Sequence, residues 1–251
     1  MPARHIPPLT LQRTAAALAL AAAMLSAAAA PAADGTCRAA SSAQAPTIVE
    51  LYTSEGCSSC PPADRWLSTL KGRPHVLALS FHVDYWDRLG WPDRFASAEG
   101  TQRQHELARL FGSNQVYTPQ VVANGQDWRI WPKLPAQSAA APVSLSLQRE
   151  GGVVTAQVGA EAAATRRLAG YWAVLEDQHQ SQVRAGENKG ETLLHDHVVR
   201  LYKPLPAWAA AQGMRAQLPV SVGVPGHPRR VVFVVTDAAT QRPLQAVALG
   251  C

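Results

Sequence analysis

Hydrophobic residues follow a strand, helix, strand pattern in the first half of the chain. Residues 47–52 and 75–82 are short, nearly continuous apolar runs, which are typical of strands covered on both faces. Between them, Trp66 and Leu70 lie one helical turn apart and predict a helix that ends near Gly72. We therefore expect parallel strands joined by a helix, with ligand chemistry beyond the carboxyl ends of the strands.

The next segment begins with an aromatic and acidic insertion, residues 83–100, and continues with a predicted helix at residues 101–111. Residues 116–122 then predict a strand. Asn124 and Gly125 form a typical hairpin turn, and residues 128–131 are the returning arm of that hairpin.

The pattern changes after a proline- and alanine-rich connector at residues 131–142. Short apolar runs with turn residues between them predict strands at 143–148, 153–158, 168–175, 193–201, 218–224, 230–236 and 244–249. Residues 206–212 predict one short helix among them. Several short strands with this spacing indicate an antiparallel β-sandwich, so we expect one domain at 45–135 and a β-rich domain at 143–251.

The amino terminus has the composition of a secretory signal peptide. Arg4 and Arg13 precede an uncharged, alanine-rich run at residues 15–30, and Ala30-Pro31-Ala32 is the best cleavage site. The alternative, an uncleaved membrane anchor, is disfavoured because the run is shorter than the roughly 20 apolar residues that a spanning helix needs. We therefore expect residues 1–32 to be removed and the mature protein to be periplasmic or secreted, with no membrane span.

Charge argues against nucleic acid as a partner. The whole chain has 23 basic and 18 acidic residues, and removal of residues 1–32 takes away two arginines and no acids. The remaining surplus is three positive charges, without a basic run or an interleaved aromatic stripe. A hydrophobic content of 47% is that of a globular protein.

Four cysteines remain in the mature chain: Cys37, Cys57, Cys60 and Cys251. Export exposes them to an oxidising compartment, where even pairing is expected. If Cys57 pairs with Cys60, a structural disulfide between Cys37 and Cys251 would join the two ends of the chain. The alternative is two free thiols in frayed termini.

Cys57 and Cys60 are separated by two uncharged serines, at the junction of a predicted strand and a predicted helix. The helix dipole lowers the pKa of the thiol nearest the helix N-terminus. One cysteine can then attack a disulfide and the other can resolve the mixed disulfide.

The segments V-E-L-Y-T-S-E-G-C-S-S-C-P-P-A-D, F-H-V-D-Y-W-D-R-L-G-W and V-Y-T-P-Q resemble those of a family of secreted bacterial proteins known as domain of unknown function 1223. The order of strand, C-x-x-C, helix and Thr-Pro also resembles the thioredoxin fold. The resemblance implies that Cys57 attacks and Cys60 resolves. It further implies that Pro119, preceded by Thr118, is a cis-proline that presents a backbone strand to the substrate. Glu50 is similar to the buried acid that helps to move the resolving proton.

Three features depart from that pattern. One extra residue separates Glu50 from the first cysteine, which would place its side chain on the other face unless a bulge absorbs the shift. Pro61 and Pro62 predict a helix that begins late, near Ser59 or Cys60. The aromatic insertion after residue 82 has no counterpart in thioredoxin.

Several side chains allow alternative interpretations. His82 and Asp84 could act as a proton shuttle or as metal ligands, although a loop whose aromatic residues cover the core is the simpler interpretation. Cys57, Cys60 and His82 could together hold copper(I) or zinc. His195 and His197 would share one face of a strand, as a weak metal pair or merely solvated. Glu55 would raise the thiol pKa of Cys57 if close, or point into water.

The expected fold class is α/β, with a thioredoxin-like N-terminal domain followed by a mainly antiparallel, sandwich-like β region. The expected function is an exported thiol–disulfide oxidoreductase that acts on protein or small thiol substrates. It needs a redox partner protein and no organic cofactor. The alternatives are a non-catalytic binding module with a structural disulfide, and a copper- or zinc-handling protein.

Overall fold

Strands dominate the described part of the chain. The computed structural model describes residues 1–3, 37–136, 140–161 and 164–251, of which 42% lie in strands and 13% in helices. The chain divides into the units Met1–Ala32 and Ala33–Cys251. All the strands and helices of the described residues belong to the second unit. The predicted signal peptide falls in the first unit, outside the described residues except for 1–3. Within the described ranges, neither α-helix has the length and apolar character needed to cross a membrane.

The strands are β1 (Cys37–Ala40), β2 (Thr47–Thr53), β3 (Val76–His82), β4 (Gln120–Ala123), β5 (Gln126–Asp127), β6 (Leu145–Glu150), β7 (Val153–Val158), β8 (Arg167–Glu176), β9 (His179–Gln182), β10 (Thr192–His195), β11 (Val198–Ala209), β12 (Met214–Pro219), β13 (Arg229–Asp237) and β14 (Pro243–Leu249). The α-helices of the described residues are α1 (Pro61–Ser68) and α2 (Ala98–Leu110), and short 3-10 helices occur at Asp87–Leu89 and Ala210–Gln212.

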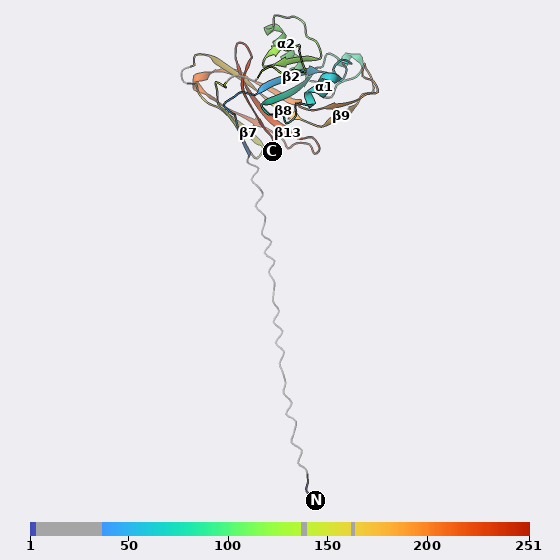
Figure 1. The fold of residues 1–251 in the computed structure, drawn as a ribbon, viewed down its shortest axis with the longest axis vertical. Coiled ribbons are helices and arrows are strands. Elements are labelled where there is room, and N and C mark those ends of the chain that lie inside the picture. The colour runs from blue at the N-terminus through green and yellow to red at the C-terminus, as the bar shows by residue number, and fades with distance from the viewer. Residues whose placement is uncertain (4–36, 137–139, 162–163) are drawn as a thin grey trace. The chain divides into compact units, whose positions relative to one another are not determined.

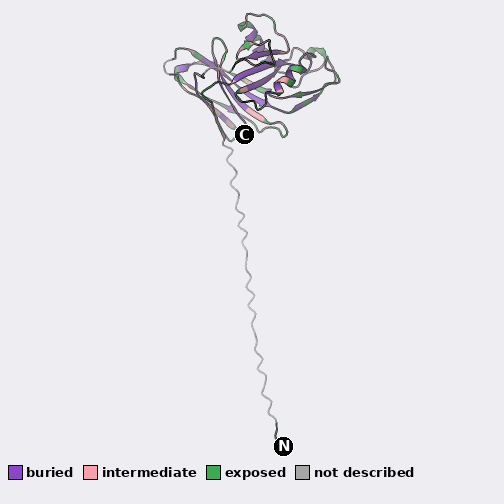
Figure 2. Ribbon diagram, viewed as in Figure 1, coloured by how far each residue is buried: buried purple, intermediate pink, exposed green. Residues whose placement is uncertain are grey.

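An eight-stranded sheet is the centre of the fold, in the order β14-β13-β8-β11-β3-β2-β4-β5 (Figure 1). β3 pairs in parallel with β2 on one side and with β11 on the other, and the remaining pairs are antiparallel. β2 is buried along its whole length, as is nearly all of β3 and β8 (Figure 2). These strands are apolar on both faces because both faces of the sheet are covered.

Three layers cover the sheet. α1 packs on one face of β2 and β3 through Ala63 and Leu67, against Val49 and Leu51, and Leu70 just after the helix joins the same cluster. On the opposite face of these strands, a second cluster contains Leu107 of α2. At the other end, a four-stranded sheet in the order β1-β6-β7-β12 packs on β8, β13 and β14. β9 and β10 form a separate two-stranded sheet beside α1 (Figure 1).

The predicted α/β, thioredoxin-like fold followed by a separate sandwich-like region was wrong. The described residues are mostly β, with two α-helices and several sheets. The strands of the second half do pack as two sheets, but they are not a separate region, because β11 pairs with the free edge of β3 and joins one of these sheets to the first-half strands. The division into domains at 45–135 and 143–251 stays a prediction, and this sheet contains strands from both ranges.

Candidate functional site

The C-x-x-C segment forms a tight turn between β2 and α1. Cys60 is the N-cap of α1, and its carbonyl accepts a hydrogen bond from Ala63 at 2.9 Å. Pro61 and Pro62 occupy the first two helical positions, where a backbone N–H has no helical partner to lose. The helix therefore begins one residue after Cys60, close to the predicted late start. Cys57 and Cys60 form a disulfide with their Cα atoms 5.4 Å apart.

This disulfide is enclosed by protein. Cys57 and Cys60 each have 0% exposure, whereas the two serines between them are exposed. A thiol from solvent thus meets Ser58 and Ser59 first and has no open path to either sulfur.

A loop from the second half of the chain lies over the turn. Residues 183–191 connect β9 to β10, and we name them the covering loop. Asn188 is 5% exposed, and its Nδ2 donates to the carbonyl oxygens of Cys57 and Glu55, both at 2.9 Å. The exposed carboxylate of Glu187 accepts from Ser58 N at 3.0 Å and from Ser58 Oγ at 2.8 Å. These bonds lower the pKa of the Glu187 carboxyl.

Buried charges lie beneath the same turn. Asp93 Oδ2 accepts from Glu55 N at 2.9 Å and is 2.6 Å from His82 Nδ1. Burial opposes ionisation of Asp93, but the positive charge and hydrogen bond of His82 dominate and lower the pKa of Asp93 to about 2. Burial likewise opposes protonation of His82, yet Asp93 raises the pKa of the imidazole. The predicted shuttle or ligand residue His82 is therefore one half of a buried ion pair.

Glu55 points into this region, so the interpretation that it faces water was wrong. It is 1% exposed, and its Oε2 accepts from Trp91 Nε1 at 2.7 Å. Its Oε1 lies 3.2 Å from His195 Nε2, with an alignment too poor for a hydrogen bond. Burial raises the pKa of Glu55, but the nearby His195 imidazole and the hydrogen bond from Trp91 outweigh burial and lower the pKa overall.

Asp64, in the first turn of α1, is a buried carboxyl that sequence reasoning missed. It accepts a hydrogen bond from Thr53 Oγ1 at 3.0 Å, and its backbone N–H donates to the Cys60 carbonyl at 3.1 Å. Burial raises the pKa of this carboxyl. Its place one turn after Cys60 was visible in the sequence, but its burial depends on the strands and on β10 packed around it.

Thr118 and Pro119 lie at the same edge of the sheet as the turn. Gln120, the first residue of β4, pairs with Tyr52 near the carboxyl end of β2. Thr118 Oγ1 accepts a hydrogen bond from Trp86 Nε1 at 2.8 Å, and the Thr118-Pro119 bond is cis. Both residues are partly exposed.

Glu50 lies elsewhere, on the sheet face that α2 covers. Its carboxylate pairs with Arg103 of α2, at 2.6 Å to Nη2 and 3.0 Å to Nε. The hydroxyls of Tyr52 and Tyr171 also donate to it, at 2.8 and 2.9 Å. The alternation that places Val49 and Leu51 against α1 places Glu50 away from α1 and its disulfide.

His195 and His197, which were expected on one face of a strand, do not share a strand. His195 ends β10, whereas His197 follows the strand with a positive φ of 58° and bonds to Arg230. Among the described residues, no group of three or more His, Cys, Asp or Glu side chains is arranged to hold a metal ion.

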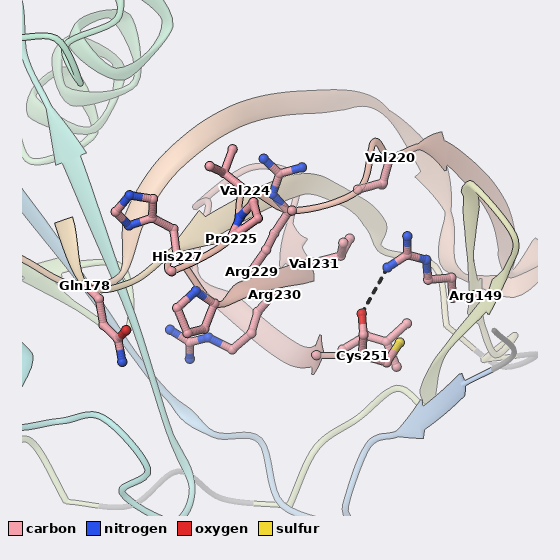
Figure 3. Close-up of a pocket in the computed structure, with 15 residues that line it drawn as sticks. Arg149, Gln178, Val220, Val224, Pro225, His227, Arg229, Arg230, Val231 and Cys251 are labelled. Carbon is pink, nitrogen blue, oxygen red and sulfur yellow. Dashed lines mark hydrogen bonds between the residues drawn. The ribbon is translucent and has the colours of Figure 1, made fainter. Parts of the chain in front are cut away.

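A hollow lies at the carboxyl terminus, with a volume of about 590 Å³ (Figure 3). Cys251 at its edge forms a disulfide with Cys37, and Arg149 Nη1 donates to the Cys251 carbonyl at 3.0 Å. Arg229 and Arg230 in its wall are paired with Glu176 and Asp177, respectively. The charges of these two arginines are thus balanced within the protein.

These features define a mostly β protein that carries a C-x-x-C disulfide at a strand-to-helix turn and closes its chain ends with a second disulfide. It belongs to the family described as Protein of unknown function (DUF1223), which matches residues 48–236. No curated protein matches the sequence.

Two solved structures are similar to this chain. One is the crystal structure of protein AGR_C_4864 from Agrobacterium tumefaciens, with 28% sequence identity and a TM-score of 0.63, covering 83% of this chain and 96% of that chain. The other is HBP35 of Porphyromonas gingivalis, with 13% identity and a TM-score of 0.49, covering 83% of this chain and 76% of that chain. The second likeness is too low to support a conclusion.

Proposed function

We propose that this protein is an exported thiol–disulfide oxidoreductase whose redox pair is Cys57 and Cys60. The observation that carries the proposal is the C-x-x-C disulfide at the end of β2, with Cys60 as the N-cap of α1. The positive end of the helix favours a thiolate over a thiol. Asp64 lies one turn further along, and its raised pKa suits it to take up and return the proton of the resolving thiol.

The reaction consists of two thiol–disulfide exchanges. In the reduced protein, the Cys57 thiolate attacks a substrate disulfide, a new S–S bond forms, and one substrate sulfur leaves as a thiolate that is then protonated. The Cys60 thiolate then attacks Cys57, releases the second substrate sulfur, and forms the Cys57–Cys60 disulfide. Two electrons and two protons pass from the protein to the substrate. The same two steps in reverse oxidise a dithiol substrate.

The substrates are proteins or small molecules that contain thiols or disulfides, and a redox partner protein restores the starting state of the pair. Thr118 and Pro119, at the same sheet edge, are proposed to align the backbone of the bound partner. Export is supported by the two disulfides, which fit an oxidising compartment outside the cytoplasm.

A second candidate function is a non-catalytic binding module in which Cys57–Cys60 only braces the turn. The complete enclosure of both sulfurs favours this alternative. A static bridge would hold β2 and α1 together without exchanging with any partner.

The reduction potential of the Cys57–Cys60 pair, measured in glutathione buffers together with insulin reduction, separates the two functions. An oxidoreductase should have a potential above about −300 mV, with turnover that Cys57→Ser abolishes. The double variant Cys37→Ser/Cys251→Ser is the matched control and should retain turnover. A potential below about −300 mV without turnover would assign the pair to the brace.

A further inference from the structure

The enclosed disulfide poses an access problem for any thiol-exchange reaction. A nucleophilic sulfur must reach Sγ of one cysteine directly, yet Cys57 and Cys60 have 0% exposure. Some neighbouring segment must therefore move before exchange. The candidates are the strands below the turn, α1, the insertion that carries Trp86 and Trp91, and the covering loop above the turn.

Of these segments, the covering loop moves at the lowest cost, because the insertion is anchored by the buried His82–Asp93 pair. β2 and β3 are interior strands of the eight-stranded sheet, and α1 is anchored in a core cluster by Ala63 and Leu67. β9 and β10 pair only with each other among the described strands, and an isolated two-stranded hairpin is marginally stable.

Few directional contacts hold the covering loop on the turn. Asn188 and Glu187 make its hydrogen bonds to residues 55–58. At the inner end of β10, the His195 ring nitrogens lack a well-aligned hydrogen bond, and a hollow of about 90 Å³ is lined by β10 and the first turn of α1.

Glycine permits the shape of the covering loop. Gly186 has φ of +74°, and a Cβ added there would meet the Cβ of Trp91 at 3.4 Å, an ordinary contact. Substitution by alanine would therefore strain the loop backbone without a clash.

We propose that the covering loop gates the Cys57–Cys60 disulfide, with the Asn188 bonds to Cys57 and Glu55 as its latch. The pair exchanges with thiols only while the loop is lifted. The inference rests on the proposed function for its biological meaning, whereas access to the disulfide is measurable whether or not the protein has turnover.

The test measures the rate at which dithiothreitol reduces Cys57–Cys60 in the folded, mature protein, followed by alkylation and mass spectrometry. Each dithiothreitol gives two electrons and two protons to the pair and leaves as a cyclic disulfide. We expect Asn188→Ala to accelerate reduction about tenfold, because two hydrogen bonds of the closed state are lost. Gly186→Ala should accelerate it about fivefold or more through backbone strain alone.

Gly112→Ala is the matched control. Gly112 also has φ of +74°, with open space around an added Cβ, and follows α2 away from the covering loop. Its reduction rate should stay within about twofold of wild type, while its unfolding free energy falls by about as much as that of Gly186→Ala.

Two results would overturn the gate. Equal acceleration in Gly112→Ala and Gly186→Ala would mean that reduction proceeds through global unfolding. Unchanged rates in both Asn188→Ala and Gly186→Ala would mean that the loop does not limit access. A working gate on a pair without turnover would refute the proposed function alone, and turnover with unchanged rates in both loop variants would refute the gate alone.

Discussion

At the scale of single residues, buried charges occupy two separate places. Glu50 of β2 and Arg103 of α2 form an ion pair between the sheet and the helix, and tyrosine hydroxyls complete their hydrogen bonds. His82, the last residue of β3, and Asp93 lie at the carboxyl ends of β2 and β3, beneath the C-x-x-C turn. The first pair belongs to the core and the second adjoins the proposed redox site, so we expect their variants to differ in effect.

Arg103→Met should lower the free energy of unfolding by about 3–5 kcal/mol, because it leaves the Glu50 carboxylate buried without a cation. The double variant Glu50→Leu/Arg103→Met should recover most of that loss, since no buried charge is left unpaired. Urea unfolding measures both. Equal destabilisation of the single and double variants would contradict the role of the pair as a compensated buried charge.

The His82–Asp93 pair should make the free energy of unfolding depend on pH in both the acidic and the neutral-to-basic range. Asp93 has a pKa of about 2 instead of 3.8, so its contribution, about 2 kcal/mol, is present above pH 3.8 and is lost as pH falls towards 2. His82 has a raised pKa, so its contribution is present below 6.5 and is lost as pH rises through the raised value.

Asp93→Asn should therefore destabilise the protein most between about pH 4 and 6.5, and less at either extreme. Unfolding free energies of Asp93→Asn and wild type across this range measure the difference. A difference that does not change with pH would show that the pair is not ionised in the folded protein.

At the scale of elements, α2 depends on its N-terminal cap. Ser97 has an extended backbone, and its Oγ accepts from Gly100 N at 3.0 Å, which satisfies one of the free N–H groups of the first turn. α2 carries Arg103 and Gln104 into the buried interior, so its start positions the Glu50 ion pair.

Ser97→Ala should cost about 1 kcal/mol of unfolding free energy, whereas Ser97→Asp should cost little because aspartate caps equally well. Thermal denaturation of the two variants measures this difference. If Ser97→Asp lost as much stability as Ser97→Ala, capping would not explain the role of Ser97.

At the scale of the whole molecule, the disulfide between Cys37 and Cys251 spans 214 residues and joins β1 to the end of β14. β1 also pairs with β6, in the sheet that covers β8, β13 and β14. The bridge thus ties the two packed sheets together at the chain ends.

The double variant Cys37→Ala/Cys251→Ala should lose about 4–5 kcal/mol of unfolding free energy, because a long loop is released in the unfolded chain. The Cys57–Cys60 potential should not change, since the bridge does not contact the C-x-x-C turn. Urea unfolding and the glutathione titration measure the two quantities. A shifted potential would show that the chain ends influence the redox pair.

The sequence by itself determined the features that depend on near neighbours. The spacing of Cys57 and Cys60 allows a disulfide at the turn, Pro61 and Pro62 delay the helix start, and Asn124 with Gly125 reverses the chain. Each follows from the conformations open to a few adjacent residues, which is why local patterns predict them.

Only the tertiary structure decided how distant segments meet. β11 extends the sheet at the edge of β3, Glu50 turns towards Arg103, and Asn188 covers Cys57 from 131 positions away. These contacts depend on how the whole chain packs, because the favoured packing buries apolar surface and pairs buried charges from distant segments. A pattern of a few adjacent residues cannot predict which distant segments meet.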